Sequence, residues 1–179
     1  MTGGEAVAAK GKWAQGITPR NFAWVIKDRF AVCERPGGYG TNHRRVRRQE
    51  EIIWVREQGF GPVVSIIPST ANLHSYTELG VEWLHRPFGP VDEPVEVLGA
   101  LYPELRDLMA GGRKLLLHGE ELGDRIAGLI GGYLVWSGMV PDGPKATAVV
   151  ERLLSRSMGP AGRGMVQLAP RLPGAAVRG

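Results

Sequence analysis

The chain has 179 residues, of which 43% are hydrophobic and 22% charged, and its formal net charge is +4. This size and composition are typical of one globular domain with its own core, and they exclude an intrinsically disordered chain. No apolar run of about 18 residues occurs, so we expect no membrane span. The start of the chain lacks the apolar region of a secretory signal, so we expect a cytoplasmic protein.

The mild net charge does not predict a nucleic-acid partner. Arginine-rich and glycine-rich composition is typical of a GC-rich bacterial genome, so we expect a bacterial protein. The single cysteine, Cys33, excludes an intrachain disulfide and a thiolate metal cage. His74 and His85 lack the spacing of metal ligands. We therefore expect neither a metal nor a cofactor.

The chain is expected to comprise a flexible N-terminal segment (1–16), one domain (17–170) and a flexible tail (171–179). Within the domain, apolar and β-branched runs predict strands at 22–26, 30–33, 62–67, 81–85 and 114–118. Helical spacing and turn residues predict helices at 43–58, 71–79, 93–110, 125–137, 145–156 and 163–169. This alternation predicts an α/β fold with a central, mostly parallel sheet flanked by helices.

The segment 115–125 is the most informative part of the sequence. An apolar strand ends at His118, a short loop follows, and a helix opens at Arg125. Loop N–H groups and the positive end of a helix together favour an anion at such a place. The sequence therefore predicts that this loop forms, or derives from, an anion-binding cradle.

The loop resembles the signature of cysteine-dependent protein phosphatases of the dual-specificity type. That signature is His-Cys, five residues, then Arg, and His118, Gly119 and Arg125 stand at its positions with the same spacing. The segment 86–94 resembles the general-acid loop of the family, and it places Asp92 at the acid position, 27 residues before Gly119. Further similarity extends the resemblance over about residues 20–170, and it implies the dual-specificity phosphatase fold.

Departures from the signature decide the expected function. The family reaction needs a thiolate, and Gly119 has no side chain. Ile126 replaces the Ser or Thr that follows the arginine in the family, and three acids occupy the loop: Glu120, Glu121 and Asp124. One unit charge at about 6 Å and an effective dielectric near 20 opposes an anion by about 3 kcal/mol. We therefore expect a pseudophosphatase that is not an enzyme and binds anions poorly.

The remaining signature residues each admit two interpretations. Arg125 either binds an anion or pairs with a carboxylate of its own loop, and we favour the pair. Asp92 is either a remnant of the general acid or the N-cap of the next helix, and we favour the cap. His118 is expected to be structural.

A second candidate ligand site is the densest basic cluster of the chain, which follows a glycine-rich loop. The basic segment is 43–48, and we call its candidate ligand-binding residues, together with Tyr39 of the preceding loop, the basic cluster: Tyr39, Arg44, Arg45, Arg47 and Arg48. Arginines and backbone amides there could hold a phosphate, a nucleotide or an acidic partner. The alternative is a solvated helix face balanced by Glu50, Glu51 and Glu57.

Three hypotheses for function follow. The first is a regulatory module that binds a protein partner through a catalytically inactive phosphatase-like domain. The second is a sensor that binds a phosphorylated ligand, a nucleotide or RNA through the basic cluster. The third is a residual enzyme with altered hydrolase chemistry, in which Glu120, Glu121, Asp92 and His118 form an acid/base or metal site.

Overall fold

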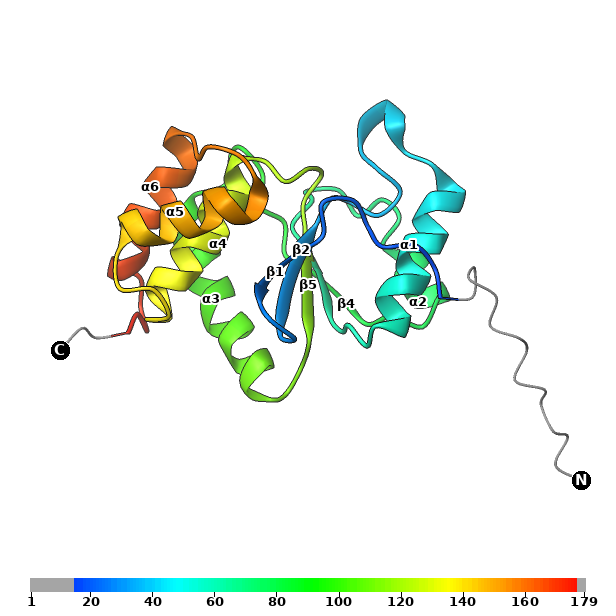
Figure 1. Cartoon of the computed structure of the whole chain (residues 1–179), viewed down its shortest axis with the longest axis horizontal. Helices are drawn as coiled ribbons and strands as arrows, with labels where there is room; N and C mark the ends of the chain where they lie inside the picture. The colour runs from blue at the N-terminus through cyan, green and yellow to red at the C-terminus, as the bar shows by residue number, and fades with distance from the viewer. Residues whose placement is uncertain (1–14, 177–179) are drawn as a thin grey trace, which may run out of the picture.

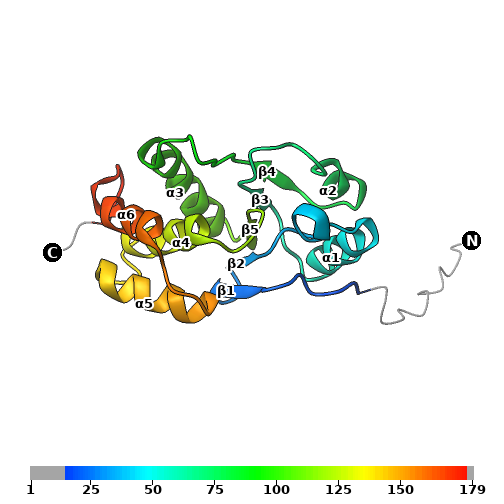
Figure 2. The same ribbon diagram turned by 90° about the horizontal axis from the view of Figure 1, so that it is seen from above.

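The computed structural model describes residues 15–176, so most of the expected flexible N-terminal segment (1–16) and the last three residues of the expected flexible tail (171–179) lie outside the described residues. Within the described residues, five strands form one sheet in the order β1-β2-β5-β3-β4; Figure 1 gives the overall arrangement, and Figure 2 labels the strands in this order. They are β1 (Ala23–Ile26), β2 (Phe30–Cys33), β3 (Val63–Ser65), β4 (Trp83–His85) and β5 (Leu115–His118). Only β1 and β2 are antiparallel, and the other pairings are parallel. The predicted α/β class with a mostly parallel sheet is confirmed.

Helices cover both faces of the sheet (Figures 1 and 2). One face carries α1 (Arg45–Glu57) and α2 (His74–Glu78). The other carries α3 (Pro94–Ala110), α4 (Asp124–Trp136), α5 (Gly143–Leu154) and α6 (Pro160–Leu168). Two short 3-10 turns, η1 (Gly40–Asn42) and η2 (Ala169–Arg171), complete the elements. Among residues 15–176, no helix has the length and hydrophobicity to cross a membrane.

The central strand β5 contributes to two cores, one on each face of the sheet. Leu115 and Leu117 are buried with the residues of α3 and α4, whereas Leu116 is buried with those of α1. This division follows from the alternation of side chains along a strand. Because both faces are covered, β5 is apolar throughout until it reaches His118.

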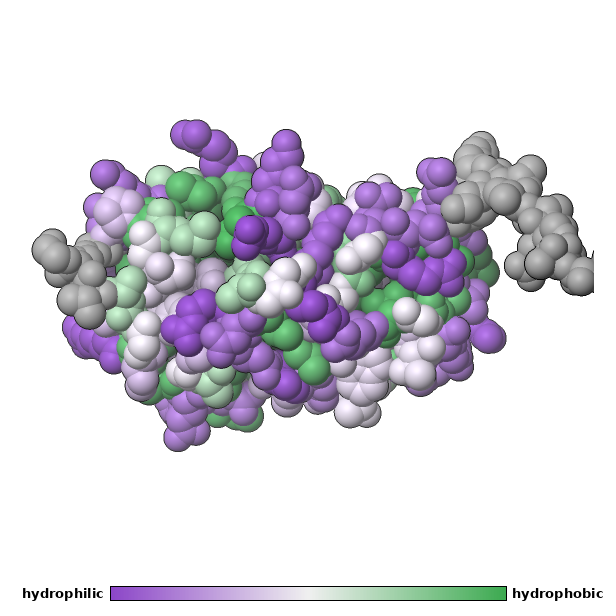
Figure 3. All heavy atoms as spheres, turned by 90° about the horizontal axis from the view of Figure 1, so that it is seen from below, coloured by the Kyte–Doolittle hydropathy of each residue, from purple (hydrophilic) through white to green (hydrophobic). Residues whose placement is uncertain are grey.

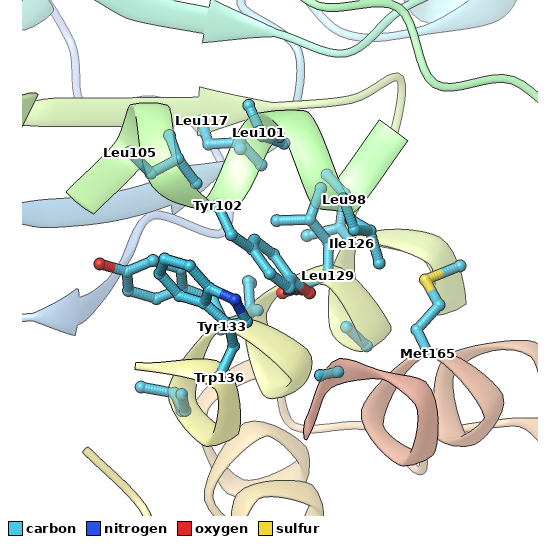
Figure 4. Packing of buried hydrophobic residues seen from close by; sticks show 14 of the residues in the cluster. Leu98, Leu101, Tyr102, Leu105, Leu117, Ile126, Leu129, Tyr133, Trp136 and Met165 are labelled. Carbon is cyan, nitrogen blue, oxygen red and sulfur yellow. Dashed lines mark hydrogen bonds between the residues drawn. The ribbon is translucent and has the colours of Figure 1, made fainter. Parts of the chain in front are cut away.

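A cluster of aromatic side chains packs α3 against α4 on one face of the sheet (Figure 4). Tyr102 of α3 contacts the rings of Tyr133 and Trp136 of α4, at centroid distances of 5.6 Å each. The hydroxyl of Tyr102 donates to the carbonyl oxygen of Leu129 over 2.8 Å. This buried bond satisfies the one polar atom that the ring brings into the core.

Close backbone approach places α6 against α4. A Cβ atom on Gly128 of α4 would lie 2.6 Å from the Cα atom of Gly162 of α6. This distance is too short for a side chain at residue 128. The glycines therefore let the two helices touch, and α6 becomes one wall of the region beside the start of α4.

The chain after α6 packs back onto α4. Leu172 is buried, the indole Nε1–H of Trp136 donates to the carbonyl of Pro173, and the Ala176 N–H donates to the carbonyl of Trp136. The sequence did not predict this packing of residues 171–176.

The end of the molecule away from the β5–α4 loop shows hydrophilic and hydrophobic side chains interspersed (Figure 3).

Candidate functional site

The loop 118–125 joins the carboxyl end of β5 to the start of α4, which is the strand–loop–helix order that the sequence predicts. Strands β2 and β3 flank β5 in parallel, so their carboxyl ends meet at this edge of the sheet. A cavity of about 350 Å³ lies beside the loop. Its apolar wall includes Ile66, Phe88, Ile126 and Met165, and its polar rim includes Glu121 and Arg125.

Gly119 occupies the junction of strand and loop, where the phosphatase signature has cysteine. A Cβ atom at this position would lie 3.0 Å from Cδ1 of Ile126 and 3.5 Å from Cγ1 of Ile66. Ordinary Cβ contacts are longer than 3.0 Å, so Ile126 would have to shift for any larger residue. Apolar side chains thus press against the position from which a nucleophile would project.

Arg125 does not pair with a carboxylate of its loop, so the favoured prediction for this residue is wrong. Its guanidinium lies over the ring of Phe88, with the central carbon 5.3 Å from the ring centroid. Its Nε atom is buried and has no hydrogen-bond partner among residues 15–176. Arg125 instead lines the cavity, whose lining also includes Glu120, Glu121 and Asp124, without forming an ion pair with any of them.

The loop acids are engaged elsewhere. The carboxylate of Glu120 accepts from Nη1 of Arg35 at 3.0 Å. The carboxylate of Asp124 accepts from the N–H groups of Gly159 and Gly162, at 2.6 and 2.7 Å, and so caps the start of α6. Glu120 and Glu121 are both exposed and line the cavity, but of the three loop acids only Glu121 lacks a hydrogen-bond or ion-pair partner among residues 15–176. The electrostatic repulsion of a bound anion is therefore smaller than three unpaired carboxylates would cause.

The loop backbone leaves several N–H groups without a backbone partner among residues 15–176. The N–H groups of residues 120–123 make none of the backbone hydrogen bonds found among the described residues. They lie next to the N-terminus of α4, which begins at Asp124. Free N–H groups and the helix end favour negative charge. The strand–loop–helix order is the one that the sequence predicts, whereas the anion cradle stays a prediction. The sequence did not predict that Arg125 would be left without a carboxylate partner.

His118 lies below the loop and away from the cavity. Its Nε2 accepts from the hydroxyl of Tyr76 at 2.9 Å, and its Nδ1–H donates to the carbonyl of Gly119 at 3.2 Å. Burial lowers the pKa of His118 to about 4, an effect that the bond to Gly119 opposes and the charge of Arg35 reinforces. A neutral, fully hydrogen-bonded imidazole of this kind fits a structural role.

Asp92 does not cap α3, so the favoured prediction for it is wrong as well. The N-cap residue of α3 is Glu93, which makes no side-chain cap bond. The carboxylate of Asp92 instead accepts from the N–H of Gly89 at 2.6 Å and closes the turn before the helix. Asp92 does not line the cavity of the loop, and no group of three possible metal ligands occurs within residues 15–176.

The basic cluster is largely engaged in internal contacts. Arg47 forms ion pairs with Glu51 and, at 3.5 Å, with Glu34. Arg48 donates from Nη1 to Nε2 of His43 at 2.6 Å. Burial, reinforced by neighbouring arginine charges, lowers the pKa of Arg48. These two arginines therefore support the loop before α1.

The other members of the basic cluster are less constrained. Arg44 donates to the carbonyls of Thr41 and His43, at 3.0 and 3.1 Å. Tyr39 is half-buried, and Arg45 is exposed. None of the cluster lines the cavity that holds Arg125, so the structure does not bring the two predicted ligand sites together.

Cys33 cannot take the place of the missing thiol. It pairs in register with His118 on the neighbouring strand, but its side chain belongs to the core on the α1 side of the sheet. It is fully buried, and burial raises the pKa of its thiol, with Glu51 and Glu34 acting in the same direction. A buried thiol of raised pKa is a poor nucleophile.

Sequence reasoning missed Arg35, Phe88 and Met165 as neighbours of the loop. Arg35 is 85 residues from Glu120, and no local pattern links the two. Phe88 lies in the segment 86–94 that resembles the general-acid loop, but the sequence indicated no role for it beside Arg125, and it indicated no role for Met165. Tertiary packing brings them to the cavity, and no sequence signal identified them.

No protein-family model and no curated protein matches the sequence. Similar solved structures exist. A kinase associated phosphatase with its catalytic cysteine replaced by serine aligns with a TM-score of 0.72 and 17% identity, over 89% of this chain and 99% of that one. The active form of Tk-PTP gives 0.65 and 20%, over 82% and 93%. A human tyrosine phosphatase-like serine/threonine/tyrosine-interacting protein gives 0.60 and 12%, over 82% and 93%. This chain has the fold of the dual-specificity and tyrosine-type cysteine phosphatases.

Proposed function

We propose that this phosphatase-like domain is catalytically inactive and acts as a regulatory module that binds a protein partner. The observation that carries the proposal is Gly119 at the end of β5, with Ile126 pressed against the space where a nucleophile would stand. Cysteine phosphatase chemistry requires attack by a thiolate, and a backbone without a side chain cannot perform it.

The neighbouring groups support the loss of catalysis. Cys33 is buried on the opposite face of the sheet. The carboxylate of Asp92, at the position of the general acid, accepts a hydrogen bond from the N–H of Gly89. His118 and Glu120 are committed to Tyr76 and Arg35. These engaged groups also argue against a residual enzyme of altered chemistry.

The cavity beside the loop 118–125 offers a place where a partner can bind. The cavity beside Arg125 has apolar walls and a polar rim, as small binding sites commonly do. Arg125 brings a cation without a carboxylate partner to this cavity. We therefore assign Arg125 to partner contact, and we regard His118, Gly119 and Asp92 as remnants of the signature.

Differential capture tests this proposal. The full chain and its Arg125→Glu variant are immobilised and exposed to lysate of the source organism. We expect a defined protein to be retained by the native chain and lost with Arg125→Glu. The Arg45→Ala variant, altered on a distant exposed arginine, serves as a control and should retain it. Failure to recover any protein that distinguishes Arg125→Glu from the native chain would contradict the proposal.

A second candidate is binding of a phosphate-containing ligand in the loop without turnover. The specific observation that favours it is the set of free N–H groups at residues 120–123 beside Arg125. The basic cluster is less suited to this role because Arg47 and Arg48 are engaged internally. Calorimetric titration with phosphotyrosine tests it. Binding should rise in Glu121→Gln, vanish in Arg125→Ala and persist in Arg45→Ala, whereas dependence on Arg45 would refute the loop site.

A further inference from the structure

A groove separate from the loop cavity runs between the turn 88–94 and helix α6. Its volume is about 440 Å³, and we call it the docking groove. Its apolar lining comprises Phe88, Pro90, Val91, Pro94, Pro160, Ala161, Met165 and Leu168. It shares Phe88, Arg125, Ala161 and Met165 with the loop cavity, so the two hollows adjoin. Figure 2 shows this end of the molecule, with α6 on the same side as α3 and α4.

One apolar residue of the docking groove is open to solvent, whereas two others are buried. Val91 is 93% exposed, and Phe88 and Met165 are 2% and 4% exposed. Pro90 and Pro94 flank the turn, and proline restricts the backbone that it occupies. The turn thus presents a large aliphatic side chain from a restrained backbone, which reduces the ordering cost of binding a partner.

The charge of the docking groove is opposite to that of the whole chain. Asp92 and Glu93 line it, and Glu121 lies at the rim of the adjoining cavity. Arg125 is the only cation among the described residues that line the two hollows. The chain as a whole carries a net charge of +4. Acidic groups beside exposed aliphatic ones complement a basic and apolar ligand.

We propose that the docking groove binds an unphosphorylated segment of the protein partner in which a lysine or arginine adjoins a large apolar residue. The apolar side chain packs between Val91 and Met165, and the basic side chain faces Asp92 and Glu93. Arg125 donates to a carbonyl oxygen of the segment. The inference rests on the proposed function and names the chemistry of the partner.

Other occupants fit less well. A phosphate dianion in this groove would face the carboxylates of Asp92 and Glu93 with only Arg125 in its favour. A second copy of the chain would have to present its own exposed basic side chains, such as Arg45. Both occupants give distinct results in the experiment below.

The experiment titrates the ¹⁵N-labelled full chain with three synthetic peptides flanked by glycine and serine. Their centres are Leu-Arg-Leu, Leu-Glu-Leu and Leu-phosphoserine-Leu. We expect the arginine peptide to shift the amide signals of residues 88–95 and 160–168, and the other two to bind at least about tenfold more weakly. Raising the salt concentration should weaken the binding of the arginine peptide but not the binding of the other two.

Variants localise the effect. Val91→Ser should lower the affinity for the arginine peptide about tenfold, the loss expected when one well-packed side chain of an interface is removed. Glu93→Gln should weaken it as well and reduce its salt dependence. Asp28→Asn, which removes an exposed acid in the turn between β1 and β2, is the matched control and should leave binding unchanged.

Three results would overturn the inference. They are equal or tighter binding of the phosphoserine peptide, no shift within the groove with any peptide, and shifts of the groove signals with protein concentration alone accompanied by a doubled mass. Phosphoester hydrolysis is followed on the same samples. An inactive chain with no preference for the arginine peptide refutes only this inference, whereas turnover by the native chain refutes the proposed function.

Discussion

The terminal Cδ1 atom of Ile126 lies 3.0 Å from the position that a Cβ atom on Gly119 would occupy. The two residues therefore fit each other: Ile126 extends into space that is open because residue 119 is glycine, and a Cβ atom at 119 requires Ile126 to move by a few tenths of an ångström. Restoring the cysteine alone therefore crowds Ile126.

Gly119→Cys alone should consequently be a poor phosphatase. Overpacking costs about 1–3 kcal/mol of stability, and the same cost added to the activation barrier would lower the rate by roughly 5- to 150-fold. Gly119→Cys with Ile126→Ser removes the contact and supplies a hydroxyl, and it should hydrolyse p-nitrophenyl phosphate faster than the single variant. Gly119→Ser with Ile126→Ser is the control without a thiol. A single variant as active as the double one would show that Ile126 does not obstruct the site.

The contact of α4 with α6 can be tested through glycine. Gly128→Ala places a Cβ atom 2.6 Å from the Cα atom of Gly162, so the helices must separate. We expect the free energy of unfolding, measured in urea, to fall by about 2–3 kcal/mol. Gly164→Ala, where a Cβ atom meets nothing within 4 Å, is the control and should be neutral or stabilising by up to about 1 kcal/mol. Equal effects of the two changes would contradict the close packing.

Asp124 is expected to act in stability and not in ligand binding. Its carboxylate accepts from two N–H groups at the start of α6, and loss of such a cap costs about 0.5–2 kcal/mol. Asp124→Ala should therefore lower the denaturation midpoint. Glu121→Ala, at an exposed neighbour, should change the free energy of unfolding by less than about 0.5 kcal/mol. An equal loss in both variants would mean that the cap contributes nothing.

His118 should make the fold sensitive to acid. Its pKa is about 4 in the folded protein, against an ordinary value of about 6.5 in the unfolded chain. The unfolded chain therefore binds more protons between these values, and stability falls as pH falls from about 6.5 to 4. The difference amounts to about 3 kcal/mol.

Chemical denaturation at pH 7 and pH 4.5 measures this contribution. His118→Gln should lose stability at pH 7 because the bonds to Tyr76 and Gly119 are disturbed, but it should depend less on pH than the native chain. His74→Gln, at an exposed histidine, should keep the native dependence. An unchanged pH dependence in His118→Gln would show that another group causes the acid sensitivity.

The order of strands and helices could be predicted from the sequence because local patterns carry it. The apolar run that ends at His118 and the helix that starts beside Arg125 are encoded within a few residues. The partners of the charged side chains could not be predicted in this way. Arg35 reaches Glu120 from 85 residues away and leaves Arg125 without a carboxylate.

A competition between two local bonds explains the error at Asp92. The residue stands just before a helix, where aspartate is a common cap, yet its carboxylate also reaches back to the N–H of Gly89. The helix begins one residue later than a cap at Asp92 requires, with Glu93 as the N-cap. Sequence spacing alone does not distinguish these two bonds, because each satisfies one backbone donor.

Steady-state hydrolysis by the purified native chain tests the central claim most directly. The substrates are p-nitrophenyl phosphate and a phosphotyrosine peptide, and Arg125→Ala and Cys33→Ser are assayed beside the native protein. We predict that all three samples release phosphate no faster than buffer. Turnover by the native chain that is abolished in Arg125→Ala would contradict the claim that this fold has lost its chemistry.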